Sequence, residues 1–590
     1  MPTVNHLKNR DAQRKTLAVA FGRHAVKGHL CWSRPEGFGG SSPNFDIYAY
    51  SALGEGEWDS CEAAYYKGIE IPPDNYHFHP GGLAEAMDSG PQQVDPDFEK
   101  DVPHTRTAAI GYKCPHNIGD FETDKTPPDG FEGIFRTKKC PDFDVYGNLI
   151  SSEWTYSANP ARCVAAALIG YGRLPNLPAA YENALEYWRS RIDWVSWNAW
   201  KEYCDELETV DYTAVAETEG FGLTASYYNG PGDFHQFITS FVQPVIDLDL
   251  GTASPAAGVD PDGFTARFEG QLRAKATGTF TFHLTHDDGV VLKIDGHAII
   301  TEWTLGVGYH TGTYEVTEGE VYPIEIEWSD VGGGASKITL EWSLKGVVAR
   351  EVISSKYLYP RVEERPRYES HVYFNSPANF ADVLRTILFV SNSVMQDVDG
   401  KLRFYCLEQL VPQFTLDNGN IDSFKFRRRD ILQSDAVTSY EAKFRDLDSQ
   451  FLEEPVTPVH LELDYLTRKN NENVKVLDLF NMTRWQARKI LEMRAKLETG
   501  NDLMAEVEAK AALTYQLMAG DLVTVEHRKT GPSPRTYLVR EATDGAVAEA
   551  SGTQTSEPET RSFVLQEWTS QEEEPIRGGG GGIGGVLLGG

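Results

Sequence analysis

The stretch Asp287-Asp288-Gly289-Val290-Val291-Leu292-Lys293-Ile294-Asp295-Gly296 decides the fold of the middle of this chain. Within it Val290, Leu292 and Ile294 alternate with other residues, and side chains two apart on a strand share one face of a sheet. An Asp-Gly pair directly after such a run is a strong hairpin signal, because a type I′ turn needs two residues with positive φ. The sequence therefore predicts a strand over 290–294 that turns back at Asp295-Gly296.

The same period of two continues on both sides of this stretch. Apolar residues alternate in three further segments, which are Phe280/Phe282/Leu284, Ile324/Ile326/Trp328 and Ile338/Leu340/Trp342. Many short strands separated by Gly and Asp turns are typical of a β-sandwich or barrel. We expect residues 220–360 to form a separate all-β module of this kind.

The residues outside this module have a different pattern. The first two hundred are rich in Gly, Pro and aromatic residues, which predicts loop-rich β structure, and apolar stripes predict helices at 159–170, 194–208, 376–392 and 483–498. We divide the chain into 1–219, 220–360, 361–576 and a Gly-rich tail at 577–590. The expected fold class is multidomain and mainly β with α+β parts, in which β domains with short helices carry an inserted β-sandwich.

Charge and cysteine content narrow the function classes. The chain has 590 residues, with 55 basic and 87 acidic residues and a formal net charge of −32. This balance argues against nucleic acid and anionic lipid as partners, because both attract an excess of Lys and Arg. The seven cysteines form no CxxC pair, which favours a reduced chain, and no apolar stretch reaches the 18 residues that a membrane span needs.

An ordered series of short segments lies on both sides of the all-β module. Its clearest member is Tyr156-Ser157-Ala158-Asn159-Pro160-Ala161, which leads into a predicted helix, and the others are 21–28, 53–58, 200–206, 364–368, 481–487 and 519–523. Taken in order, these segments resemble the family of lambda-type (protein J-like) phage tail tip attachment proteins and baseplate hubs. Since the resemblance continues on both flanks, the all-β module resembles an insertion into one discontinuous scaffold.

The resemblance to tail hubs implies a function and partners. It implies a homotrimer that closes the tail tube, contacts the distal tail protein, the tape measure protein and other tail-tip proteins, and is part of the virion at the tail tip or baseplate after assembly in the host cytoplasm. Closed rotational symmetry suits such a role, because it ends a tube without leaving open sheet edges.

The all-β module itself resembles the anthrax protective-antigen-type β-sandwich. The matching core is Asp287-Asp288-Gly289 through Ile294-Asp295-Gly296, with further matches at 222–228, 264–270, 278–282, 322–326 and 358–360. In lectins of that family, a cis peptide between two such aspartates directs both carboxylates to one Ca²⁺, and sugar hydroxyls complete the coordination. The resemblance therefore implies a host saccharide as a ligand of this module.

Asp287 and Asp288 are the candidate metal ligands, since adjacent carboxylates at a strand end suit a hard cation such as Ca²⁺. Asp330, in a Gly-rich loop, is a candidate for a further ligand. The alternative is that Asp-Asp-Gly simply forms a turn whose carboxylates bond the backbone.

Trp303, Tyr309 and His310 are the candidate ligand-binding residues. They follow the hairpin in a stretch that we expect to be a loop, and an aromatic face stacks well on a sugar ring. The alternative is ordinary packing at a sheet edge.

The sequence contains no GxSxG, HExxH or Walker motif and no GxGxxG after a strand, so we expect a structural protein rather than an enzyme. The alternative function is a carbohydrate-active enzyme with an inserted sugar-binding domain. The lack of a TIM-barrel strand–helix alternation argues against that alternative.

Overall fold

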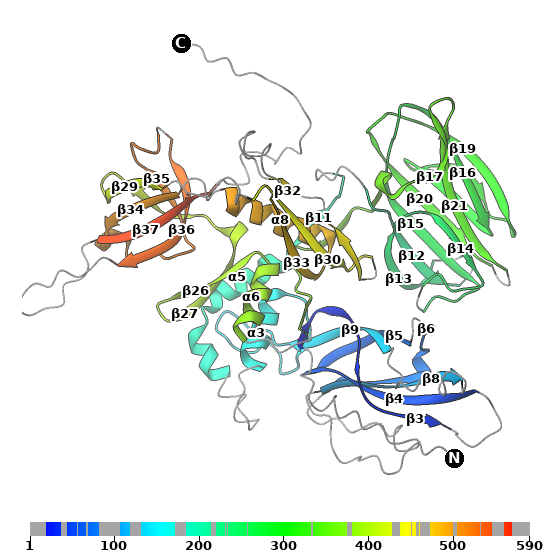
Figure 1. Cartoon of the computed structure of the whole chain (residues 1–590), viewed down its shortest axis with the longest axis horizontal. Coiled ribbons are helices and arrows are strands. Elements are labelled where there is room, and N and C mark those ends of the chain that lie inside the picture. The colour runs from blue at the N-terminus through cyan, green and yellow to red at the C-terminus, as the bar shows by residue number, and fades with distance from the viewer. Residues whose placement is uncertain are drawn as a thin grey trace, which may run out of the picture.

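The computed structural model describes residues 19–36, 44–55, 57–66, 69–81, 107–117, 131–170, 185–213, 220–230, 232, 234–256, 258–331, 334–374, 380–427, 437–449, 451–455, 459–460, 473–499, 504–531, 533–544 and 560–568. The chain is mainly β with few helices, as the sequence predicts. Figure 1 shows a β-sandwich (green) that stands to one side of the other sheets and helices. Within the described ranges, no helix combines the length and apolar character needed to cross a membrane.

Two sheets build the N-terminal part of the scaffold. One has the order β3 (His29–Glu36), β4 (Asn44–Glu55), β8 (Thr107–Asn117) and β7 (Tyr76–His79). The other has the order β10 (Thr155–Tyr156), β9 (Phe131–Cys140), β5 (Trp58–Tyr66) and β6 (Ile69–Glu70), and β2 (Arg23–Val26) pairs with β9. Trp58, Tyr112 and Phe135 are fully buried in one core with residues of both sheets.

The described residues contain the four predicted helices, together with one short helix that was not predicted. They are α3 (Pro160–Gly170), α5 (Trp194–Asp205), α6 (Phe380–Val390), α8 (Arg484–Thr499) and the short α9 (Ala511–Thr514). Asn159 caps α3, since its Oδ1 accepts a 2.9 Å hydrogen bond from the amide of Ala161. The α5 helix ends three residues before the predicted 208, because Glu206 is extended and leads into β11 (Leu207–Val210). Residues 376–379 of the helix predicted at 376–392 lie outside the described residues.

The two flanks of the sandwich fold together into one scaffold. The strand β1 (Val19–Phe21) pairs with β25 (Val372–Phe374), and β11 pairs with β24 (Glu363–Pro366). One hydrophobic core contains buried residues of α3 and α5 from the first flank together with α6 and α8 from the second. Figure 1 shows α3, α5 and α6 side by side. The stretches before 210 and after 361 are therefore a single body, as an insertion into a discontinuous scaffold requires.

The second flank continues through three further sheets. The hairpin β26 (Ser393–Val398) and β27 (Lys401–Cys406) is followed by a sheet of β30 (Ser439–Asp446) with β31 (Leu452–Pro455), β32 (Val459–His460) and β33 (Val474–Met482). The last sheet has the order β28 (Pro412–Asp417), β35 (Leu522–Glu526), β36 (Arg535–Asp544), β37 (Thr560–Glu567), β34 (Met504–Lys510) and β29 (Ile421–Arg427).

The insertion is a two-sheet sandwich. One sheet has the order β13 (Gln236–Gln243), β12 (Leu223–Asn229), β15 (Phe264–Arg273), β20 (Val321–Ser329), β17 (Gly289–Ile294) and β18 (His297–Glu302), with β23 (Leu358–Pro360) on β15. The other has the order β14 (Asp247–Gly251), β21 (Ser336–Leu344), β16 (Gly278–Asp287) and β19 (Gly308–Val316), with β22 (Val348–Val352) on β21. Asp295 and Gly296 have φ values of 49° and 74°, so the predicted hairpin between β17 and β18 is confirmed.

The register of β15 defines the two ends of the sandwich. Its last residues pair with β23, where Gln271 lies opposite Tyr359, and this is the end at which the chain enters and leaves. Its first residues lie at the other end, where Thr265 pairs with Ser329. The loops before β17, after β18 and after β20 all lie at this second end, which we call the distal end because it points away from the connection to the scaffold.

Candidate functional site

The Asp287-Asp288-Gly289 stretch is the corner at which the chain passes from one sheet of the sandwich to the other. Asp287 ends β16, which belongs to the sheet that contains β14, β21 and β19. Gly289 begins β17, which belongs to the other sheet, beside β20. The peptide bond between Asp287 and Asp288 is cis, as the resemblance implied. Gly289 lies against the indole of Trp303, because a Cβ there would be 3.1 Å from Trp303 Cε3. The distal end is therefore closely packed around this corner.

The carboxylate of Asp288 joins two loops at the distal end. Its Oδ1 accepts a 2.6 Å hydrogen bond from the amide of Gly306, in the loop between β18 and β19. Its Oδ2 accepts a 2.7 Å hydrogen bond from the amide of Val331, in the loop after β20. Hydrogen bonds to an ionised acceptor are roughly twice as strong as neutral ones. Asp288 therefore has the backbone-bonding role that the turn alternative predicted.

Asp287 and Asp330 complete an acidic corner around Asp288. Burial raises the pKa of Asp287, and the negative charge of Asp288 raises it further. Burial also raises the pKa of Asp330, which is 4% exposed, and Asp288 again adds to the shift. The negative charge of Asp288 therefore repels both Asp287 and Asp330. A bound cation would relieve this repulsion.

The side chains at this corner fit a calcium ion only in part. In the described part of the chain, no group of three or more His, Cys, Asp or Glu side chains is placed to hold a metal ion. Calcium accepts six to eight oxygen ligands, which include backbone carbonyls, water and ligand hydroxyls as well as carboxylates. A calcium site here would therefore consist of Asp287 and Asp288 supplemented mainly by oxygens other than side-chain carboxylates.

The three candidate ligand-binding residues do not lie together. Only Trp303 is in a loop, and the expectation of a loop for Tyr309 and His310 was wrong, because both belong to β19, which starts at Gly308 and pairs with β16. Successive strand residues point to opposite faces, so this pairing separates their side chains. The ring of His310 lies 5.2 Å from that of His286.

Tyr309 lies on the outer face of its sheet and is held there by its neighbours. Its hydroxyl is 2.7 Å from Nδ1 of His283, and the guanidinium of Arg350 lies over its ring at 4.9 Å from the centroid. The ring is also stacked against His283. Its ring is therefore committed to contacts within the sheet, which corresponds to the edge-packing alternative.

Sequence reasoning missed two residues that shape this end. The Nε1 of Trp328 donates a 2.7 Å hydrogen bond to the carbonyl of Asp287, and Nδ1 of His286 bonds the carbonyl of Asp288. The period of two placed Trp328 on an inward face, but only the sheet pairing brings it next to the corner. No local sequence signal indicates either contact.

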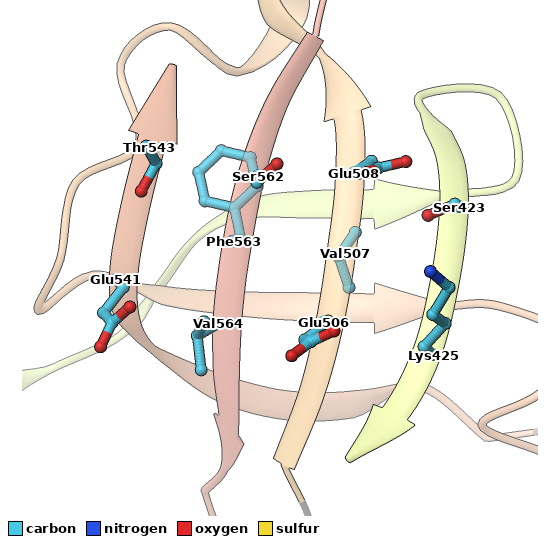
Figure 2. Close-up of a pocket in the computed structure, with 10 residues that line it drawn as sticks. All are labelled: Ser423, Lys425, Glu506, Val507, Glu508, Glu541, Thr543, Ser562, Phe563 and Val564. Carbon is cyan, nitrogen blue, oxygen red and sulfur yellow. The ribbon is translucent and has the colours of Figure 1, made fainter. Parts of the chain in front are cut away.

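A hollow lies on the face of the last sheet of the scaffold. Its volume is about 320 Å³, and it is lined by residues of β29, β34, β36 and β37. Figure 2 shows Glu506 and Glu541 on either side of Val564, in agreement with the strand register, and Lys425 beside Glu506. Of the two carboxylates, that of Glu506 has a cation of the same chain beside it.

Comparison with known proteins gives one family match and several more distant similarities. Residues 221–356 match the PA14 domain. The anti-sigma-I factor RsgI3 of Acetivibrio thermocellus is 33% identical over 147 residues, which are 25% of this chain and 22% of that protein. The chain therefore spans less than a quarter of the length of this relative.

Two of the solved structures with some similarity to this chain cover different shares of it. The PA14 sugar-binding domain from an RTX adhesin is 19% identical, with a TM-score of 0.21, and the match covers 24% of this chain and 99% of that domain. A chain from the virion of a native gene transfer agent particle is 11% identical, with a TM-score of 0.44, and the match covers 96% of this chain and 87% of that chain. The family match to residues 221–356 agrees in position with the two-sheet sandwich, so the insertion in this chain is a PA14 domain.

Proposed function

We propose that this protein is a structural component of a phage-type virion, the hub at the distal end of a long tail. In this proposal three copies close the tail tube and contact the distal tail protein and the tape measure protein. The PA14 domain is then presented outward on the rim, where it binds a host saccharide.

One observation carries the hub proposal. The segments that resemble tail hubs lie on both flanks of the PA14 domain, and β1 with β25 and β11 with β24 join these flanks. If the two flanks folded as separate domains without contact, they would not form the single scaffold that the resemblance to tail hubs implies. The shared core of α3, α5, α6 and α8 supports the same proposal.

The hub proposal is tested by the assembly of the purified full chain. We expect a particle of three times the 65.8 kDa chain mass, with threefold symmetry in negative-stain images. The measurement is made on the chain alone and in mixture with the distal tail protein that the proposal names as its partner. A protein that stays monomeric in both conditions would contradict the proposal.

For the saccharide, we propose that Asp287 and Asp288 hold Ca²⁺ and that Trp303 packs against the sugar ring. The support is the acidic corner described above and the indole of Trp303, which is 46% exposed beside it. Asp330, on which the charge of Asp288 acts, is a further candidate oxygen ligand, while Tyr309 lies on the outer face of its sheet and takes no part in this arrangement. A calcium ion bound there would coordinate sugar hydroxyls, which would replace water molecules among its ligands.

Calorimetric titration of the full chain with Ca²⁺, followed by a glycan array with and without a chelator, tests this proposal. We expect Asp287→Asn to abolish both signals, because it removes one of two carboxylate ligands. Asp295→Asn is the matched control, since Asp295 lies in the turn after β17 at the opposite end of the sandwich, where its carboxylate accepts a 3.1 Å hydrogen bond from the hydroxyl of Tyr314. Saccharide binding that persists in chelator would show that calcium is not needed for binding. The absence of any saccharide binding would contradict the proposed saccharide function.

A further inference from the structure

Four large apolar side chains are exposed together at the distal end of the PA14 domain. Their exposed fractions are 46% for Trp303, 72% for Leu305, 78% for Val307 and 38% for Val331. In the described part of the sandwich, the other exposed large apolar residues are Phe237, Tyr309 and Val347. Scattered exposed apolar residues need no explanation, whereas a cluster marks a surface that contacts something other than water.

The two loops that carry this cluster are held in place. The amide of Gly306, between Leu305 and Val307, and the amide of Val331 both bond the carboxylate of Asp288. The indole of Trp303 is fixed at the base of the same loop by its contact with Gly289. Because these loops are already ordered, contact with an apolar phase costs little further conformational entropy.

The shape of the cluster indicates the kind of partner. Side chains that are exposed by 72% and 78% are surrounded by solvent on most sides, so Leu305 and Val307 protrude rather than line a groove. No charged residue occurs between Glu302 and His310. A protruding apolar loop with a tryptophan at its base suits the boundary of a lipid bilayer, where apolar side chains enter the acyl region and indoles lie at the headgroups.

The position and the charge of the cluster narrow the partner further. The distal end points away from the connection to the scaffold, so an extended surface can approach it. The carboxylate of Asp288 bonds the amides of Gly306 and Val331, so its negative charge lies at the base of the apolar cluster and would repel anionic headgroups. A bilayer of zwitterionic lipid is therefore the surface that fits both features.

We propose that the loop 303–307, together with Val331, inserts into the surface of a zwitterionic lipid bilayer. This activity goes beyond the hub function and needs neither calcium nor a saccharide. It would place the PA14 domain against a membrane through apolar contacts, and Asp288 acts as a positioning residue that keeps the two loops together.

Flotation of the full chain with phosphatidylcholine vesicles, in chelator, tests this proposal. The double variant L305S/V307S should bind at least about tenfold more weakly, since burying one Val or Leu side chain contributes about a factor of ten or more to partitioning. Val347→Ser is the matched control, because Val347 is 68% exposed in the turn between β21 and β22 of the same sandwich. Its binding should equal that of the unchanged protein.

Three outcomes would overturn the proposal. The first is that the unchanged chain does not float with phosphatidylcholine vesicles, and the second is that the two variants lose binding equally. The third is a change of oligomeric state in L305S/V307S, which would show that the cluster joins protein subunits instead. Vesicles with phosphatidylglycerol at low and high salt separate insertion from charge-driven adsorption, because only adsorption weakens strongly with salt. Since trimer formation and sugar binding are measured separately, failure here leaves the hub proposal intact.

Discussion

The backbone amide of Arg23 donates a 2.9 Å hydrogen bond to Nδ1 of His371, although 348 residues separate them along the chain. This hydrogen bond lies next to the pairing of β1 with β25. Gly22, which separates the end of β1 from Arg23 along the chain, has a φ of 85°. This contact shows how closely the two flanks of the PA14 domain are joined. It also makes the joint sensitive to a single methyl group.

Gly22→Ala should destabilise the scaffold by about 2–4 kcal/mol, because a Cβ at this position overlaps His371 and the carbonyl oxygen of Ser370 and the positive φ is itself unfavourable. Thermal and urea denaturation measure the change. Gly400→Ala is the matched control, with a φ of 77° and no atom within 4 Å of the added Cβ. Its expected cost is about 1 kcal/mol, and equal costs for both variants would show that the joint is not closely packed.

Trp200→Phe should lower the stability of the scaffold by about 2–3 kcal/mol. The indole of Trp200 is stacked on Phe404 at 5.3 Å, and its Nε1 donates a 2.8 Å hydrogen bond to Ser393, so it links the two flanks. Calorimetry measures the unfolding transitions. Trp328→Phe is the reciprocal variant, since Trp328 is buried within the PA14 domain, and it should affect the transition of that domain instead.

Asp288→Asn should loosen the distal loops without unfolding the sandwich. An amide side chain cannot accept hydrogen bonds on both of its terminal atoms, so one of the amides of Gly306 and Val331 loses its partner at a cost of about 1–3 kcal/mol. Hydrogen exchange should become about ten- to hundredfold faster in one or both of these loops. Asp287→Asn is the control, and protection that is unchanged in Asp288→Asn would contradict the loop-joining role.

Asp446 should make the stability of the scaffold depend on pH. This residue ends β30 and is fully buried, and burial raises its pKa to about 7, with a further contribution from the charge of Asp448. The unfolded chain releases this proton near pH 4. The folded state therefore binds more protons between about pH 4 and 7, and the free energy of unfolding falls as the pH rises through this interval.

Asp446→Asn removes this contribution, so the variant should lose less stability than the unchanged protein between pH 4.5 and pH 7.5. Urea denaturation at several pH values measures the difference, and the titration of groups that do not interact with Asp446 cancels in the comparison. Parallel pH profiles for the two proteins would show that Asp446 does not titrate in this interval.

Much of the PA14 domain could be predicted from local sequence. Alternating apolar residues such as Phe280, Phe282 and Leu284 are buried as the period of two predicts, because the pleat of a strand assigns successive side chains to opposite faces. The Asp295-Gly296 turn forms because these two residues tolerate positive φ. The first residues of α3 and α8 could also be predicted from nearby sequence, because capping residues and apolar stripes act over a few residues.

The candidate site depended on contacts that no local pattern encodes. Asp287 and Asp288 were found from their resemblance to a known motif, but only the sheet order brings the amides of Gly306 and Val331 to the Asp288 carboxylate. The pairing of β19 with β16 shows that Tyr309 and His310 are successive residues of a strand, so their side chains lie on opposite faces of the sheet. The sequence by itself thus determined the period, the turns and the acidic pair, because these depend on neighbours along the chain. Only the tertiary structure decided that Arg23 meets His371 and that the apolar loop protrudes beside Asp288, because these depend on packing between distant segments.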